Sequence, residues 1–166
     1  MSAAGPGGAE RALAAAQALG LEVTVTRHGP VRSLAEAAAA RGVGPDRLVK
    51  TMVVRRGEDD YLLVLVPGDR TIAWPRLRAL LGVTRLSMPP ASEALAATGY
   101  ERGTITPFGA RPGPHGPWSV VADERVRGGA VSLGGGEHGV GLTVDAEAML
   151  GALDATVADV TDASPS

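Results

Sequence analysis

The sequence predicts a single α/β domain with a mixed, mostly antiparallel and partly barrel-like sheet and helices packed outside it. Three observations support this class. The 166 residues are 45% apolar and 20% charged, which suits one core of ordinary size. Short apolar runs of strand length alternate with alanine-rich stretches of helical length. Glycine or proline stands at the end of most of these segments.

The chain starts with a stretch rich in Gly, Ala and Pro. We expect a disordered tail at residues 1–8, the folded domain at 9–162 and a second tail at 163–166. The alanine-rich run at 9–19 predicts the first helix, because a glycine follows it as a stop signal. Alternating apolar and polar residues at 21–26 predict a half-buried strand.

A second helix and a hairpin follow. Ser33 and Glu36 have the spacing of a capping box, which predicts a helix that runs to about Arg41. The apolar runs at 48–54 and 61–66 flank an acidic turn and predict a β-hairpin.

The remaining elements are assigned by the same signals. Helices are expected at 74–81, 90–98 and 145–153, and strands at 83–86, 118–122, 130–133, 140–144 and 156–160. The stretch at 99–117 is too rich in glycine and proline for a helix or a regular strand. Irregular segments of this length inside compact domains are often functional.

Charge and residue content exclude several function classes. A net charge of −2 argues against a protein that coats duplex nucleic acid, although it permits a grip on one end of an RNA. There is no cysteine, and the three histidines lie far apart, so neither a thiolate nor a zinc site is expected. No apolar run approaches a membrane span, and the N-terminus lacks the pattern of a secretory signal. We expect no metal, no cofactor, no DNA or membrane partner, and a cytoplasmic location.

Lys50 is the only lysine among 16 basic residues, and it lies in the first half of an apolar strand. A lysine retained where the chain otherwise uses arginine suggests a site that needs a compact ammonium group. The alternative is a lysine near a strand end whose amine reaches water.

Two glycine clusters, at 103–107 and 134–139, are places where backbone N–H groups can closely approach a ligand. Neither is a P-loop, because no Gly-Lys-Ser/Thr follows and no long helix begins there. Taken singly, each is also explained as an ordinary turn.

The order of these features carries more information than any one of them. Lys50-Thr51 is followed by Gly99-Tyr100, the G-x-x-x-P loop at 103–107, Val131-Ser132 with a glycine turn, and Ala158-Asp159-Val160. This order resembles the YbaK/prolyl-tRNA-synthetase-associated family of aminoacyl-tRNA editing domains over about residues 21–162.

The resemblance implies hydrolysis of the ester between a wrong amino acid and its tRNA. Many members act on mischarged prolyl tRNA, which suggests a small wrong amino acid on tRNA-Pro as the substrate. The expected partner is the acceptor end of an aminoacyl-tRNA, together with a possible synthetase partner. No synthetase catalytic or anticodon-binding region fits into this short chain, so it resembles a free-standing, trans-acting member.

The resemblance also assigns residues. Lys50 matches the lysine that is thought to hold the acceptor end, and Gly103 begins the loop whose backbone positions the substrate. An aminoacyl ester is already activated, so oriented donors and a placed water suffice without a metal or a Ser-His-Asp arrangement. The further substrate-binding candidates are Thr51, Thr104, Ile105, Pro107, Ser132, His138 and His28.

The chain departs from the cysteine-editing pattern. Such members have a basic residue where His138 stands and an acid where Gly141 stands, and the segment at 26–30 lacks their tyrosine. Two alternatives to a deacylase therefore stay open. One is a non-catalytic module that binds the tRNA acceptor end or an aminoacyl adenylate. The other is a nucleotide-binding regulatory domain built on the glycine turn at 134–139.

Overall fold

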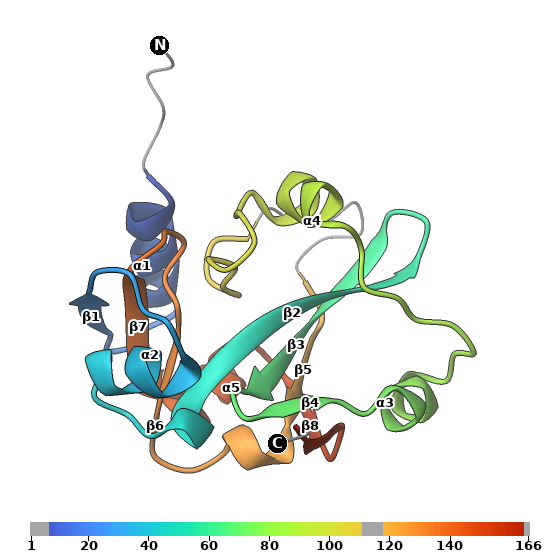
Figure 1. Ribbon diagram of the computed structural model, residues 1–166. Coiled ribbons are helices and arrows are strands. Elements are labelled where there is room, and N and C mark those ends of the chain that lie inside the picture. Colours follow the sequence, from blue (N-terminus) through green and yellow to red (C-terminus); the bar gives the residue numbers. More distant parts are fainter. Residues whose placement is uncertain (1–6, 111–117, 165–166) are drawn as a thin grey trace.

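The computed structural model describes residues 7–110 and 118–164 as a seven-stranded sheet, a two-stranded sheet and five α-helices (Figure 1). Residues 1–6 of the tail predicted at 1–8, residues 111–117, and residues 165–166 of the tail predicted at 163–166 lie outside the described residues. Gly8 is already helical and Ala163 still lies in a strand. The helices are α1 (Gly8–Ala18), α2 (Leu34–Ala40), α3 (Trp74–Leu81), α4 (Ala91–Thr98) and α5 (Ala146–Ala152), with 3-10 turns η1 (Pro45–Arg47) and η2 (Glu124–Val126). The strands are β1 (Thr24–Arg27), β2 (Leu48–Gly57), β3 (Asp60–Pro67), β4 (Arg70–Ile72), β5 (Val120–Asp123), β6 (Ala130–Gly134), β7 (Val140–Asp145), β8 (Thr156–Ala158) and β9 (Thr161–Ala163). This confirms the predicted α/β class.

The large sheet has the order β1-β7-β6-β2-β3-β5-β8. The β1–β7, β6–β7 and β2–β3 pairs are antiparallel and supply most of the paired residues. The shorter β2–β6, β3–β5 and β5–β8 ladders are parallel. Strands β1 and β8 lie at opposite edges, so the expected barrel-like form does not become a closed barrel.

Helix ends follow their local sequence signals. The Ser33 hydroxyl accepts from the Glu36 backbone N–H at 3.1 Å and begins α2. Asp145 caps α5 in the same way through the Ala148 N–H at 3.0 Å. Helices α3 and α4 end at Gly82 and Gly99, whose left-handed φ angles of 68° and 83° favour glycine.

Three strand assignments need correction. The segment at 83–86 is not a strand; beside it, only Ser87 forms an isolated bridge, to Arg55. Strands β4 and β9 were not expected, because they are three residues long and pair over a large sequence separation, from Arg70 to Ala163. Such short edge pairs leave no periodic pattern in the sequence.

The two faces of the sheet bury separate apolar clusters. Val49 and Val53 of β2 belong to the larger cluster, which includes residues of α1, α5 and the segment after α4. Val54 belongs to the smaller cluster, which α3 covers through the buried Leu77. This division follows from the alternation of side chains along a strand.

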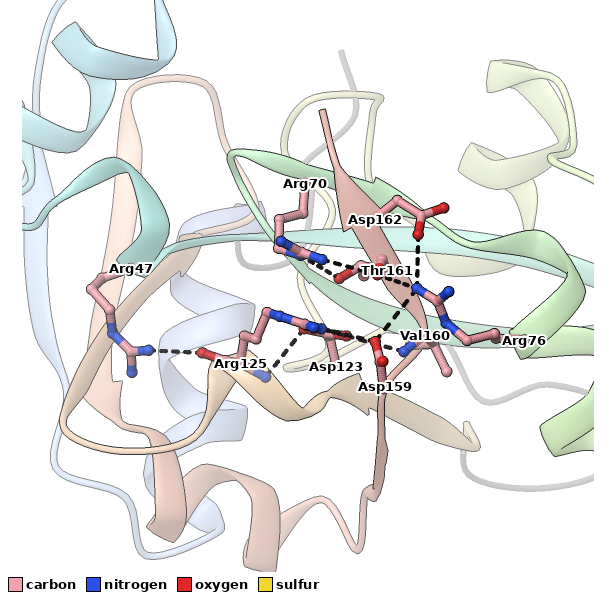
Figure 2. Close-up of polar contacts among 9 residues, drawn as sticks. All are labelled: Arg47, Arg70, Arg76, Asp123, Arg125, Asp159, Val160, Thr161 and Asp162. Carbon is pink, nitrogen blue, oxygen red and sulfur yellow. Dashed lines mark hydrogen bonds and ion pairs between the residues drawn. The ribbon is translucent and has the colours of Figure 1, made fainter. Parts of the chain in front are cut away.

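A polar network fixes the C-terminal strands to the sheet (Figure 2). Asp123 is fully buried and accepts from the Val160 N–H at 3.1 Å and from Arg125. Arg125 also donates to Asp159 at 2.9 Å, and Arg76 reaches the same carboxylate at 3.5 Å. Because the buried carboxylate of Asp123 is fully hydrogen-bonded, it orders the chain between β8 and β9.

No helix within residues 7–110 and 118–164 is long and apolar enough to cross a bilayer.

Candidate functional site

The site lies at a gap in the sheet along one edge of β2. Strand β6 pairs with β2 only through Leu48 and Val49. Further along the same edge, Arg55 exchanges two backbone hydrogen bonds with Ser87, at 2.8 and 3.0 Å. Backbone groups alternate in direction along a strand, so the N–H and C=O groups of Thr51 and Val53 face the same edge as those of Arg55. Between the two pairings, no backbone group within residues 7–110 and 118–164 bonds to this edge.

A cavity of about 600 Å³ opens at this gap, a size typical of small-molecule sites. Strand β2 forms one wall, and the start of α4 with the preceding residues forms another. The loop after α4, the end of β6 and the end of α2 complete it. The lining residues are Arg41, Leu48, Val49, Lys50, Thr51, Met52, Val53, Met88, Pro89, Pro90, Ala91, Ala94, Arg102, Gly103, Ile105 and Gly134.

Lys50 lines this cavity with a half-buried side chain. Its Nζ donates to the Arg70 carbonyl of β4 at 2.8 Å. Burial lowers the pKa of Lys50, and the nearby carboxylate of Asp69 opposes that shift. Side-chain alternation and the β2–β6 register place Lys50 on the same face of the sheet as Gly134. The ammonium group therefore stands between β4 and the cavity.

Thr51 provides a free polar group. Its side chain is 9% exposed, and its Oγ1 has no hydrogen-bond partner in the described part of the chain. A buried hydroxyl without a partner is costly, so its presence in a cavity wall indicates a ligand or water contact.

The loop that begins at Gly103 is held from both sides. Gly103 has a φ of 88°, and a Cβ there would lie 3.6 Å from His138 Cε1. The Thr104 N–H bonds to the Glu101 carbonyl at 2.9 Å, and the Thr104 carbonyl accepts from the Gly136 N–H at 3.0 Å. These bonds tie the first glycine cluster to the second and fix the loop backbone beside the cavity.

The two candidate histidines lie near each other beside the cavity, because the His28 N–H donates to the carbonyl of Gly139, the residue after His138, at 2.9 Å. The exposed His138 lies beside Gly103, and its Nε2 is 3.3 Å from Glu101 Oε2. His28 contacts the cavity through Arg41, whose Nε lies 3.4 Å from His28 Nε2.

The structure thus brings Lys50, Thr51, Gly103 and Ile105 to one cavity, with His138 and His28 next to it. Thr104, Pro107 and Ser132 are not among its lining residues. Thr104 and Ser132 are buried, and the Ser132 hydroxyl has no partner within the described residues. We therefore expect these three residues to shape the loop and strand rather than to contact substrate.

Sequence reasoning missed Arg41 and the wall formed by Met88 and α4. Arg41 stands at the end of its helix, where a basic residue is unremarkable. The feature that distinguishes it is Gly141, whose missing side chain leaves room for that of Arg41. This contact can be recognised only once the fold is known.

Residues 28–151 match the family described as aminoacyl-tRNA editing domain. The chain belongs to this family. The match covers the walls of the cavity, from Arg41 to Gly134, and confirms the resemblance that the order of the motifs indicated.

Named relatives are consistent with this assignment. The chain is 32% identical over 108 residues to the proline–tRNA ligase of Pelobacter propionicus, a match that covers 65% of this chain but 18% of the ligase. It is 25% identical to EbsC of Enterococcus faecalis, a candidate Cys-tRNA(Pro)/Cys-tRNA(Cys) deacylase, over 81% of this chain and 78% of that protein. A solved structure of a candidate trans-editing enzyme for prolyl tRNA synthetase superposes with a TM-score of 0.83 at 25% identity, covering 96% and 99% of the two chains.

Proposed function

We propose that this editing domain is an aminoacyl-tRNA deacylase, which hydrolyses the ester that joins a wrong amino acid to tRNA. The observation that carries the proposal is the cavity at the β2 gap. There Lys50, the Thr51 hydroxyl and the Gly103 loop meet around a strand edge, and in the part of the chain that the structure describes neither that hydroxyl nor that edge has a partner.

These groups suit ester hydrolysis without a nucleophilic side chain. An aminoacyl ester needs an oriented water and fixed donors for the oxyanion. The open β2 edge and the loop backbone at Gly103 offer such donors, and the Thr51 hydroxyl is placed to hold the water or the acyl group. In our proposal Lys50 supplies positive charge for the acceptor end, after exchanging its bond to the Arg70 carbonyl for the substrate.

The proposed substrate is tRNA-Pro that carries a small wrong amino acid. Support comes from the names of the proline–tRNA ligases and of the candidate deacylase among the relatives. The chain spans only 14% to 18% of the first ligases it matches, so this specificity is inferred for the editing region alone. Apolar pockets discriminate by about 1–3 kcal/mol per methylene, which makes a small acyl group the natural target of selection by size. A trans-acting role in the cytoplasm is part of the same proposal.

The test is a single-turnover deacylation panel with alanyl-, cysteinyl- and prolyl-tRNA-Pro. We expect hydrolysis of at least one mischarged species well above the spontaneous rate, and sparing of prolyl-tRNA-Pro. Binding of these RNAs without any hydrolysis would contradict the proposal and favour the non-catalytic acceptor-end module.

A further inference from the structure

The cavity contains a cation that the proposed hydrolysis does not use. Arg41 follows α2 and lines the cavity with a half-buried side chain. It lies over Gly141 of β7, where a Cβ would stand 2.6 Å from Arg41 Cδ and Nε. The glycine therefore makes the room that the guanidinium occupies.

Most of the hydrogen-bonding capacity of Arg41 is unused. Its Nε lies 3.4 Å from His28 Nε2, and His28 Nδ1 lies 2.8 Å from the Gly29 carbonyl. The carbonyl can only accept, so Nδ1 carries the proton and Nε2 accepts from Arg41. Within the described residues Arg41 has no carboxylate partner and no further hydrogen bond, which leaves the four N–H groups of its terminal nitrogens free.

This arrangement is costly without a ligand. Arg41 is half-buried, so its cation has lost part of its hydration, and this burial lowers the pKa of Arg41. A desolvated guanidinium is normally compensated by an anion, and its planar fork fits a phosphate in a two-point contact.

We propose that Arg41 binds the 5′-phosphate of the terminal nucleotide, whose ribose carries the ester. This inference rests on the proposed function, because it assumes that the acceptor end enters the cavity. A phosphate is the anion that every tRNA brings to this place, whatever amino acid it carries. His28 is a positioning residue, because it accepts the hydrogen bond of Arg41 Nε and leaves the two terminal nitrogens of the guanidinium free for the phosphate.

The experiment measures binding of adenosine and adenosine 5′-monophosphate, by titration, to the intact chain. The wild-type protein should bind the monophosphate about 10-fold to 100-fold more tightly, the scale of hydrogen bonds to a charged group. Arg41→Met should remove this preference and leave adenosine binding unchanged. Arg127→Met is the matched control, because Arg127 precedes β6 at the end away from the cavity and its side chain is 60% exposed.

A second variant separates position from charge. Gly141→Ala keeps every charge but forces the guanidinium to move, so it should also reduce the preference, whereas Gly151→Ala, with open space around its Cβ, should not. Equal loss of both ligands in Arg41→Met, or a wild type without preference for the monophosphate, overturns the inference. The readout does not depend on turnover. A preference that requires Arg41 in a protein that deacylates nothing would refute the proposed hydrolysis and leave the phosphate site standing.

Discussion

Three neighbouring residues of the cavity differ in how their polar groups are engaged. The Lys50 amine is bound by the Arg70 carbonyl, the Thr51 hydroxyl has no partner within the described residues, and Gly103 has a left-handed backbone. The sequence indicated all three residues, because a single lysine and an irregular glycine-rich loop can be recognised in the amino-acid sequence. It did not indicate which of them keeps a free group, since that depends on the divergence of β6 from β2.

Thr51→Val tests the free hydroxyl at the residue scale. Because the hydroxyl is buried without a partner, its replacement by a methyl group should leave stability unchanged or raise it by up to about 1 kcal/mol. The single-turnover rate should fall about 10-fold, the loss of one hydrogen bond to substrate or water. Urea unfolding and rapid-quench deacylation measure the two effects.

Thr143→Val is the matched control for that substitution. The Thr143 hydroxyl of β7 is also buried and unpartnered among the described residues, but it is not in the cavity wall. The same gain in stability with an unchanged rate is expected there. Equal rate losses in the two variants would show that Thr51 has no special role.

Gly103→Ala tests the loop backbone. The change strains a φ of 88° and should shift the peptide groups that face the cavity, so the rate should fall about 100-fold, the scale of one lost oxyanion donor. Gly128 has a φ of 85°, open space around its Cβ and a place at the other end of β6. Gly128→Ala should therefore reduce stability by a similar amount, about 1 kcal/mol, and leave the deacylation rate unchanged. Similar rates for the two alanine variants would remove the loop from the site.

At the scale of elements, α4 is a wall of the cavity that one carboxylate holds in place. Glu93 of α4 accepts from the Tyr61 hydroxyl at 2.6 Å and lies 3.5 Å from Arg55 Nε. This helix and its stop at Gly99 were predicted, because proline at the start and glycine at the end are local signals. Its attachment to the β2–β3 hairpin was not predicted, because Tyr61 and Glu93 are 32 residues apart.

Tyr61→Phe should loosen α4. We expect a loss of about 1 kcal/mol of stability at pH 8 and a raised KM with a smaller effect on kcat, since the wall moves but the reacting groups stay. The hydrogen bond to Glu93 is the main cause that raises the pKa of Tyr61 to about 12. Because the pKa is higher in the folded state, the hydrogen bond contributes its full stabilisation of the fold below the unfolded-state pKa of 10. This contribution is lost as the pH rises through 12. The stability difference between wild type and variant should therefore shrink between pH 10 and 12, and a constant difference would contradict this account.

At the scale of the whole molecule, the topology joins distant parts of the chain. The parallel β2–β6 and β3–β5 pairs and the short β4–β9 sheet bring the C-terminal third against the first hairpin. The strand order could not be predicted from the sequence, because the pairing of two parallel strands has no local sequence signal. An antiparallel hairpin can be predicted, because its short turn has one. The family resemblance, which rests on the order of motifs along the chain, was predictable and is confirmed.

The network of aspartates and arginines that joins these parts predicts that the stability of the fold falls at acid pH. The hydrogen bond from Arg125 is the main cause that lowers the pKa of Asp159 below its ordinary value of 3.8. Because the pKa of Asp159 is lower in the folded state, its carboxylate contributes its full stabilisation of the fold above pH 3.8. This contribution is lost as the pH falls through the folded-state pKa. Asp159→Asn should therefore be less stable than wild type at pH 6, and the difference should shrink as the pH falls below 3.8. A difference that persists unchanged at pH 2.5, measured by urea unfolding, would exclude this ion pair as its source.

The single-turnover deacylation rate of Lys50→Ala on mischarged tRNA-Pro tests the central claim most directly. Lys50 lines the cavity and is the cation that the sequence resemblance assigns to the acceptor end. We expect circular dichroism like that of the wild type and a stability loss of about 1 kcal/mol for the bond to Arg70. The rate should fall at least 100-fold, the scale of one lost electrostatic contact in the transition state, and Lys50→Arg should not restore it. A folded Lys50→Ala protein that deacylates at the wild-type rate would contradict the assignment of this cavity as the hydrolytic site.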